Sequence, residues 1–203
     1  MSSENGTQGA TDEQCRLDAG TQLLVSTTTM QDSLSLLPAA AFQHLLIVSS
    51  DSPAALEQIL LKQDIDLSGI GVVPVSGSPV EYDGDLWTSK AVFPDDLTGL
   101  SMRVTSALDA LDALDPGQGW VLFDTLNALF MYARRERVCR LFDHVTRAAT
   151  ERDVRGVYTV AGDALDDEAY ASLQRSVDRT SVVSDHVGDL SRPRTSVRHS
   201  TNS

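Results

Sequence analysis

Short apolar runs of four or five residues recur along the chain, and each is bounded by polar or turn-forming residues. Runs of this length with apolar centres are typical of strands that are buried on both faces of a sheet. The pattern therefore predicts strands at 22–26, 45–49, 71–75, 120–123, 156–160 and 180–183. Pro74 places the third of these strands at an edge of the sheet or ends it early, because proline cannot donate to a ladder.

Amphipathic segments lie between these runs, with apolar residues repeating at helical intervals. Each segment follows an Asp or Ser that can accept a hydrogen bond from the first turn of a helix. The capping candidates, in chain order, are Asp32 or Ser33, Asp51 or Ser52, Asp95 or Asp96, and Asp166. Pro53 fits the first turn of the second helix.

Strands that alternate with amphipathic helices predict an α/β fold, a three-layer α/β/α sandwich with a mostly parallel sheet. We expect this domain to span residues 21–187. Polar, aperiodic segments at 1–20 and 188–203 predict a disordered N-terminal segment and a disordered tail. Residues 76–94 read as a loop that Trp87 and Phe93 hold against the body, with Trp87 as an alternative docking residue.

The charged residues indicate the environment in which this domain works. The 203 residues include 16 basic and 29 acidic side chains, a net charge of −13, and Lys62 and Lys90 are the only lysines. Dense short carboxylates with almost no lysine are typical of proteins from high-salt archaea, where they keep a protein hydrated. The alternative is an ordinary acidic protein. Either reading disfavours a nucleic-acid partner, because phosphate binding needs a basic patch.

Several classes of protein are excluded by what the sequence lacks. No apolar stretch approaches the roughly 18 residues of a membrane span, and the polar N-terminus has no signal-peptide region. We therefore expect a cytoplasmic protein with no membrane partner. Cys15 and Cys139 are expected to be free thiols, and the four histidines share no metal-ligand spacing with them.

The run Trp120 to Phe123 ends in Asp124, followed by Thr125 and a small, apolar stretch. This segment resembles the Walker B strand of RecA/KaiC-like ATPases. The resemblance implies that Asp124 would hold Mg²⁺ beside the phosphates of a nucleotide, with Thr125 next to it. Without a nucleotide, Asp124 would instead accept hydrogen bonds at the end of its strand.

A second segment, residues 47–53, is similar to the stretch after the second strand in KaiC-like domains, where two adjacent acids activate the attacking water. Here Ser50 stands at the first acidic position and Asp51 at the second. The resemblance makes Asp51 a candidate general base. The alternative is that Asp51 is a helix cap before Pro53.

The P-loop expected after the first strand of this family is degenerate. A phosphate cradle needs glycines that let backbone N–H groups approach the phosphates, and a lysine that neutralises them. Residues 26–33 contain neither, and they include the acidic Asp32. With its acidic composition, the chain resembles haloarchaeal RecA/KaiC-like proteins of unknown function, the Htr-like proteins.

These features predict a catalytically inactive RecA/KaiC-like domain that acts as an interaction or regulatory module linked to signalling, rather than an enzyme. No cofactor is expected, and the partner would be a protein or a second copy of the chain. The alternative is a residual ATPase domain that binds Mg-ATP through Asp124, Thr125 and Asp51. The arginines between Arg134 and Arg140 are expected to be a solvated helix start that pairs with local acids.

Overall fold

The apolar runs that predict strands all lie in one sheet. The computed structural model describes residues 17–27, 33–161 and 165–183. Its strands are β1 (Gln22–Thr27), β2 (Leu45–Ser49), β3 (Ile70–Pro74), β4 (Trp87–Thr88), β5 (Trp120–Asp124), β6 (Arg155–Ala161) and β7 (Arg179–Val183). They follow the order β4-β3-β2-β5-β6-β1-β7, and every pairing is parallel. The predicted three-layer α/β/α fold is confirmed, with a wholly parallel sheet.

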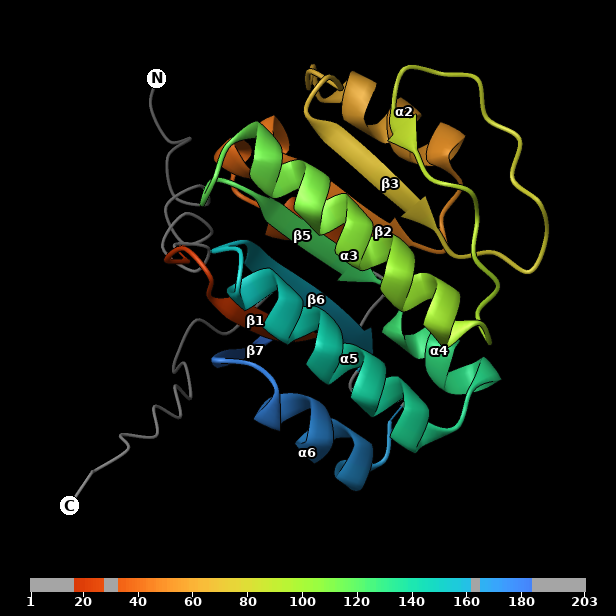
Figure 1. Cartoon of the computed structure of the whole chain (residues 1–203), viewed down its shortest axis with the longest axis vertical. Helices are drawn as coiled ribbons and strands as arrows, with labels where there is room; N and C mark the ends of the chain where they lie inside the picture. The colour runs from red at the N-terminus through yellow and green to blue at the C-terminus, as the bar shows by residue number, and fades with distance from the viewer. Residues whose placement is uncertain (1–16, 28–32, 162–164, 184–203) are drawn as a thin grey trace, which may run out of the picture.

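Helices cover both faces of this sheet. One face carries the 3-10 helices η1 (Ser33–Leu36) and η2 (Ala39–Gln43) together with α2 (Pro53–Lys62). The other face carries α3 (Leu97–Leu114), α4 (Leu126–Tyr132), α5 (Arg135–Thr150) and α6 (Asp167–Arg175). Figure 1 looks onto this second face, with α3 and α5 side by side and α2 behind the sheet.

Alternate residues of each strand enter the two cores, as the pleat of a strand requires. In β2, Leu45 and Ile47 pack with η1, η2 and α2, whereas Leu46 and Val48 pack with α3 and α5. All four side chains are at most 2% exposed. This two-sided burial explains why the strands read as continuous apolar runs rather than as alternating ones.

The helices α2, α3 and α6 begin at predicted capping residues, and the structure shows which member of each candidate pair is the cap of α2 and of α3. Ser52 Oγ accepts a hydrogen bond from the N–H of Ala55 at 3.2 Å, so Ser52 rather than Asp51 caps α2. Asp96 and Asp166 cap α3 and α6 in the same way. In place of the helix predicted after Asp32 or Ser33, the described residues form η1 and η2, separated by Pro38. Asp32 lies outside the described residues.

The segment predicted as a loop, residues 76–94, contains strand β4, which pairs with β3. Strand β3 is therefore not an edge strand, although it does end at Pro74 as predicted. The side chains that anchor this segment are Leu86 and Val92, each 4% exposed, whereas Trp87 and Phe93 stay half exposed. Leu86 and Val92 are thus the main anchors, while the half-exposed ring of Trp87 also lies against Gly71 of β3, as predicted.

The packed part of the chain begins before the predicted boundary at residue 21. Leu17 is buried, and its carbonyl accepts a hydrogen bond from Nε of Arg155 at 2.9 Å. The tail predicted at 188–203 lies outside the described residues. Within the described part of the chain, no helix is long and apolar enough to span a membrane.

Candidate functional site

The carboxyl ends of β2 and β5 lie side by side, and Ser49 is the register partner of Asp124. After β2 the chain turns to α2 on one face of the sheet, and after β5 it turns to α4 on the opposite face. In open parallel sheets, ligands bind at such a point, where the connections diverge. The structure therefore brings the two segments of the predicted site, 47–53 and 120–125, together between the carboxyl ends of β2 and β5, a place that is called the crevice below.

Both carboxylate oxygens of Asp124 accept hydrogen bonds from hydroxyl groups of the same chain. Thr159, in the adjacent strand β6, donates to Oδ1. Ser33, at the start of η1, donates to Oδ2 at 2.5 Å. These two bonds fix the orientation of a half-buried carboxylate. They fit the role of a strand-end acceptor, the alternative to a Mg²⁺ ligand.

Thr125 is 3% exposed, and its hydroxyl lies 2.7 Å from the hydroxyl of Ser50. This contact joins the two segments that follow β2 and β5. Because its hydroxyl is used in this way, Thr125 precedes α4 without making a side-chain cap. Thr125 is thus at the crevice, as the resemblance implies, with its side chain directed to Ser50.

Asp51 is exposed, and its backbone N–H donates to Ser49 Oγ at 3.0 Å. Within the described part of the chain, its carboxylate takes part in no hydrogen bond or ion pair. The candidate general base therefore lies at the rim of the crevice beside the cap residue Ser52, while Ser50 occupies the position nearer to Thr125.

The segment at the place of a phosphate cradle is only partly described. Ser26, at the end of β1, is 6% exposed, and Ser33 is bonded to Asp124. Residues 28–32, including Asp32, lie outside the described residues. Among the residues that are described, no group of three or more His, Cys, Asp or Glu side chains could hold a metal ion.

The basic cluster at the start of α5 contacts acidic residues of α6. Arg135 forms ion pairs with Asp166 and Glu168 of α6, each at 3.0 Å. Hydrogen bonding from the N–H of Ala169, together with the charge of Arg135, lowers the pKa of the Asp166 carboxyl. The prediction that this cluster pairs with local acids is therefore confirmed for Arg135.

Comparison with known families decides the affiliation. A family model matches residues 8–181, which is most of the chain. The chain belongs to DUF7504, a family of unknown function. No curated protein matches the sequence of this DUF7504 member.

Among solved structures, this DUF7504 chain is similar to the KaiC-like protein PH0186 from the hyperthermophilic archaeon Pyrococcus horikoshii OT3. The TM-score is 0.56 at 11% sequence identity, and the match covers 82% of this chain and 72% of the other. At this identity the likeness concerns the fold alone. It supports the RecA/KaiC-like fold that the sequence motifs imply.

Two residues of the DUF7504 crevice were not predicted as part of it. Thr159 is a polar residue near the carboxyl end of an otherwise apolar strand, and this position is the signal that could have marked it. The sequence predicts Ser33 as a helix cap and as the last residue of the degenerate P-loop segment, 26–33, but not as a partner of Asp124. Its contact with Asp124 joins residues 91 positions apart, which no local pattern contains.

Proposed function

We propose that this DUF7504 protein is a catalytically inactive RecA/KaiC-like domain that serves as an interaction or regulatory module, linked to signalling, in the cytoplasm of a haloarchaeon. The observation that carries the proposal is the state of Asp124. Its two carboxylate oxygens are hydrogen-bonded to Thr159 and Ser33, beside a segment that has neither the glycines nor the lysine of a phosphate cradle.

The residues of the crevice do not fit Mg-ATP well. Phosphoryl transfer depends on positioned positive charge around the phosphates. The crevice offers the carboxylate of Asp124 and the hydroxyls of Ser50 and Thr125, which bond to each other. Residues 26–33 supply no basic side chain, and Asp32 adds a negative charge. This composition supports loss of catalysis rather than a rearranged ATPase.

A surface beside the crevice supports the interaction role. Met131 and Tyr132, at the end of α4, are 80% and 63% exposed. The exposed Arg134 and Arg137 follow directly, at the start of α5. Apolar anchors next to arginines are typical of the central residues of protein interfaces. On a chain with a net charge of −13, this cationic, apolar surface favours an acidic protein partner.

The nucleotide question is tested by calorimetric titration of Mg-ATP into the purified protein in molar KCl. We expect no binding heat, and no phosphate release in a turnover assay. Asp124→Ala and Asp51→Asn test the implied site, and Asp83→Asn is a matched control because Asp83 is an exposed carboxylate in the 76–94 segment. Micromolar binding that Asp124→Ala loses and Asp83→Asn keeps would overturn the proposal in favour of the ATPase alternative.

The interaction role is tested with the double variant Met131→Glu and Tyr132→Glu. We expect a complex captured from cell extract, or a self-association seen by light scattering, to be lost in this variant. Leu61→Glu is the matched control, because Leu61 is also an exposed apolar residue, at 56%, but lies on α2. Equal loss in both variants, or in neither, would remove α4 from the interface.

A further inference from the structure

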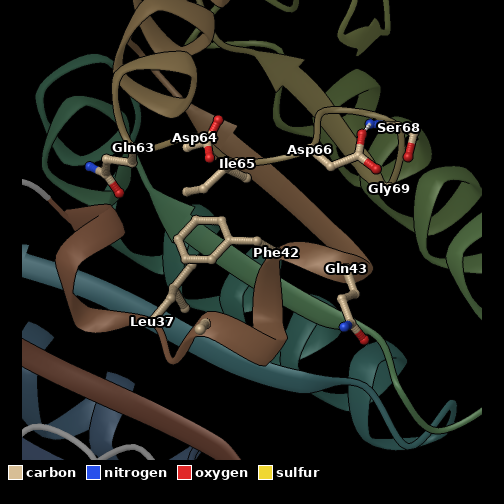
Figure 2. A pocket seen from close by; sticks show the side chains of 10 residues that line it. Leu37, Phe42, Gln43, Gln63, Asp64, Ile65, Asp66, Ser68 and Gly69 are labelled. Carbon is tan, nitrogen blue, oxygen red and sulfur yellow. Dashed lines mark hydrogen bonds between the residues drawn. The ribbon is translucent and has the colours of Figure 1, made fainter.

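An open cavity of about 660 Å³ lies at the amino ends of β2 and β3, at the opposite end of the strands from Asp124, and its polar lining residues, Asp64 and Asp66 included, are exposed. One wall is η2, which leads into β2, and the other is the turn at 63–69, which leads into β3. Figure 2 shows the side chains that line it. Small-molecule sites in proteins have volumes of roughly 300–1,000 Å³ and combine an apolar lining with a few polar groups. The size of this cavity falls within that range.

The apolar part of the lining is continuous with the hydrophobic core. Leu37 is 8% exposed, and the half-buried Phe42 and Ile65 pack against the core on this face of the sheet. In Figure 2 the ring of Phe42 lies between Leu37 and Ile65. An aromatic ring beside branched aliphatic groups suits a flat apolar ligand, and the face of such a ring attracts cations.

The charge in the lining has one sign. Asp64 and Asp66 line the cavity, and no Lys, Arg or His is among the described residues that do so. The N–H of Ser68 donates to Asp66 Oδ1 at 3.0 Å, and this bond lowers the pKa of the Asp66 carboxyl. Asp66 therefore stays ionised at neutral pH. The amide groups of Gln43 and Gln63 add neutral hydrogen-bonding groups.

Asp64 occupies a position that glycine favours. It follows the end of α2 in the left-handed conformation, with φ of 57°. Asp64 N donates to the carbonyl of Leu61, and Ile65 N donates to that of Leu60, which is the Schellman pattern of helix termination. A carboxylate at this position costs some backbone energy relative to glycine, and it places a negative charge on the cavity lining.

The two walls are held together by backbone. Leu45 N donates to Gly69 O at 3.0 Å, and a Cβ at Gly69 would lie 1.8 Å from the carbonyl oxygen of Gln43. Only glycine allows this close approach. Any other residue at position 69 would force η2 and the turn at 63–69 apart. The backbone of the two walls is therefore held in a fixed relative position.

We propose that this cavity binds a small organic cation, with an amidinium, guanidinium or ammonium group carried on a flat apolar body. The body packs on Phe42 and Ile65, and the cation faces the carboxylates of Asp64 and Asp66. An anionic ligand of the same shape is excluded by repulsion from the two carboxylates.

The test uses three probes of the same shape, namely benzamidine (cationic), benzamide (neutral) and benzoate (anionic). Each is titrated into ¹⁵N-labelled full-length protein, at the lowest KCl concentration at which the protein stays folded, because salt screens the charge term. We expect benzamidine to shift the amide signals of Phe42, Ile65 and Ser68, and not those of Thr125 and Thr159. Its affinity should exceed that of benzamide by about three- to fivefold, the effect of partly exposed ion pairs, and benzoate should not bind.

Matched variants separate the cavity from the acidic surface as a whole. The double variant Asp64→Asn and Asp66→Asn should lose the preference for benzamidine, whereas Asp83→Asn with Asp95→Asn, two exposed carboxylates outside the cavity, should keep it. Asp64→Gly suits the left-handed backbone and gives a second, well-folded test of the Asp64 charge. Equal binding of the three probes, an unchanged preference in Asp64→Asn with Asp66→Asn, or shifts spread over the whole surface would each overturn the proposal.

Discussion

The hydroxyls of Ser50 and Thr125 lie 2.7 Å apart and join the ends of β2 and β5 where the chain leaves the sheet towards opposite faces. In the resemblance to KaiC-like domains, Ser50 stands at an acidic position and Thr125 follows the Walker B aspartate. In this protein the residues at these two positions are uncharged and form a hydrogen bond with each other. Polar groups of the two segments thereby bond to each other within the chain.

Thr125→Val should remove this contact and destabilise the protein by about 1 kcal/mol, the usual net value of such a hydrogen bond. For a chain of this size the melting temperature should fall by roughly 2–4 °C. Thermal unfolding of Thr125→Val, Ser50→Ala and the double variant gives the coupling energy between the two residues. Strictly additive losses would mean that the contact contributes nothing to stability.

Asp124→Ala should lower stability in the absence of any nucleotide, because the hydroxyls of Ser33 and Thr159 lose their acceptor. We expect a loss of about 2–3 kcal/mol in the free energy of unfolding, as is typical for hydrogen bonds to a charged group. Asp124→Asn, which keeps one acceptor oxygen, should lose less. Denaturant unfolding at fixed KCl measures both, and a stability equal to that of the surface control Asp83→Asn would contradict this structural role.

Ser52→Ala should cost about 1 kcal/mol, because it removes the hydrogen bond that caps α2. Asp51→Ala should change stability little, since the Asp51 carboxylate is not the cap. Ser52→Asp, which restores a capping oxygen, should recover most of the loss. Chemical unfolding of the three variants checks this order, and a larger effect at Asp51 would reverse the assignment of the cap.

The stabilising effect of Asp166 should depend on pH. Its pKa is lowered by the hydrogen bond from Ala169 and by Arg135, so folding favours the ionised form. The contribution is complete above the usual Asp pKa of about 3.9 and is lost as the pH falls through the lowered pKa of the folded state. The melting temperature of Asp166→Ala should be below that of the wild-type protein at pH 7, and the two should converge in acid.

Asp167→Ala is the control for this experiment, because Asp167 is an exposed neighbour in the first turn of α6 and is not the capping residue. A difference between Asp166→Ala and wild type that persists unchanged at low pH would show that the carboxylate charge is not its source.

The sheet could be predicted from sequence because strands buried on both faces leave a strong signal. The runs around Leu46 and Val121 are apolar throughout, and the cap at Asp166 is followed at once by a helical repeat. Strand β4 gave no signal, because its two residues pair only with β3 and one of them, Trp87, is half exposed. The inference from Pro74 that β3 is an edge strand was wrong for the same reason, because the undetected strand β4 pairs with β3.

The candidate site was predicted in part. Asp124 and Thr125 follow a strong strand pattern, so the crevice could be located. What these side chains touch depends on Ser50 and Thr159, which come from other strand ends. The cavity at the amino ends of β2 and β3 could not be predicted from sequence. It is formed by η2 and the turn at 63–69, whose close approach depends on Gly69. Such contacts are products of the tertiary fold.

Strand β1 lies between β6 and β7, although it is the first strand of the chain. During synthesis, Leu24 and Val25 are therefore made long before either of their neighbours in the sheet exists. Pairing over such sequence separations requires the closure of large loops, which slows folding. Until then the apolar strand β1 is unpaired and can form non-native contacts. A ribosome that stalls before residue 155 leaves β1 with no native neighbour at all. Repulsion between the acidic side chains would then reduce aggregation of the incomplete nascent chain.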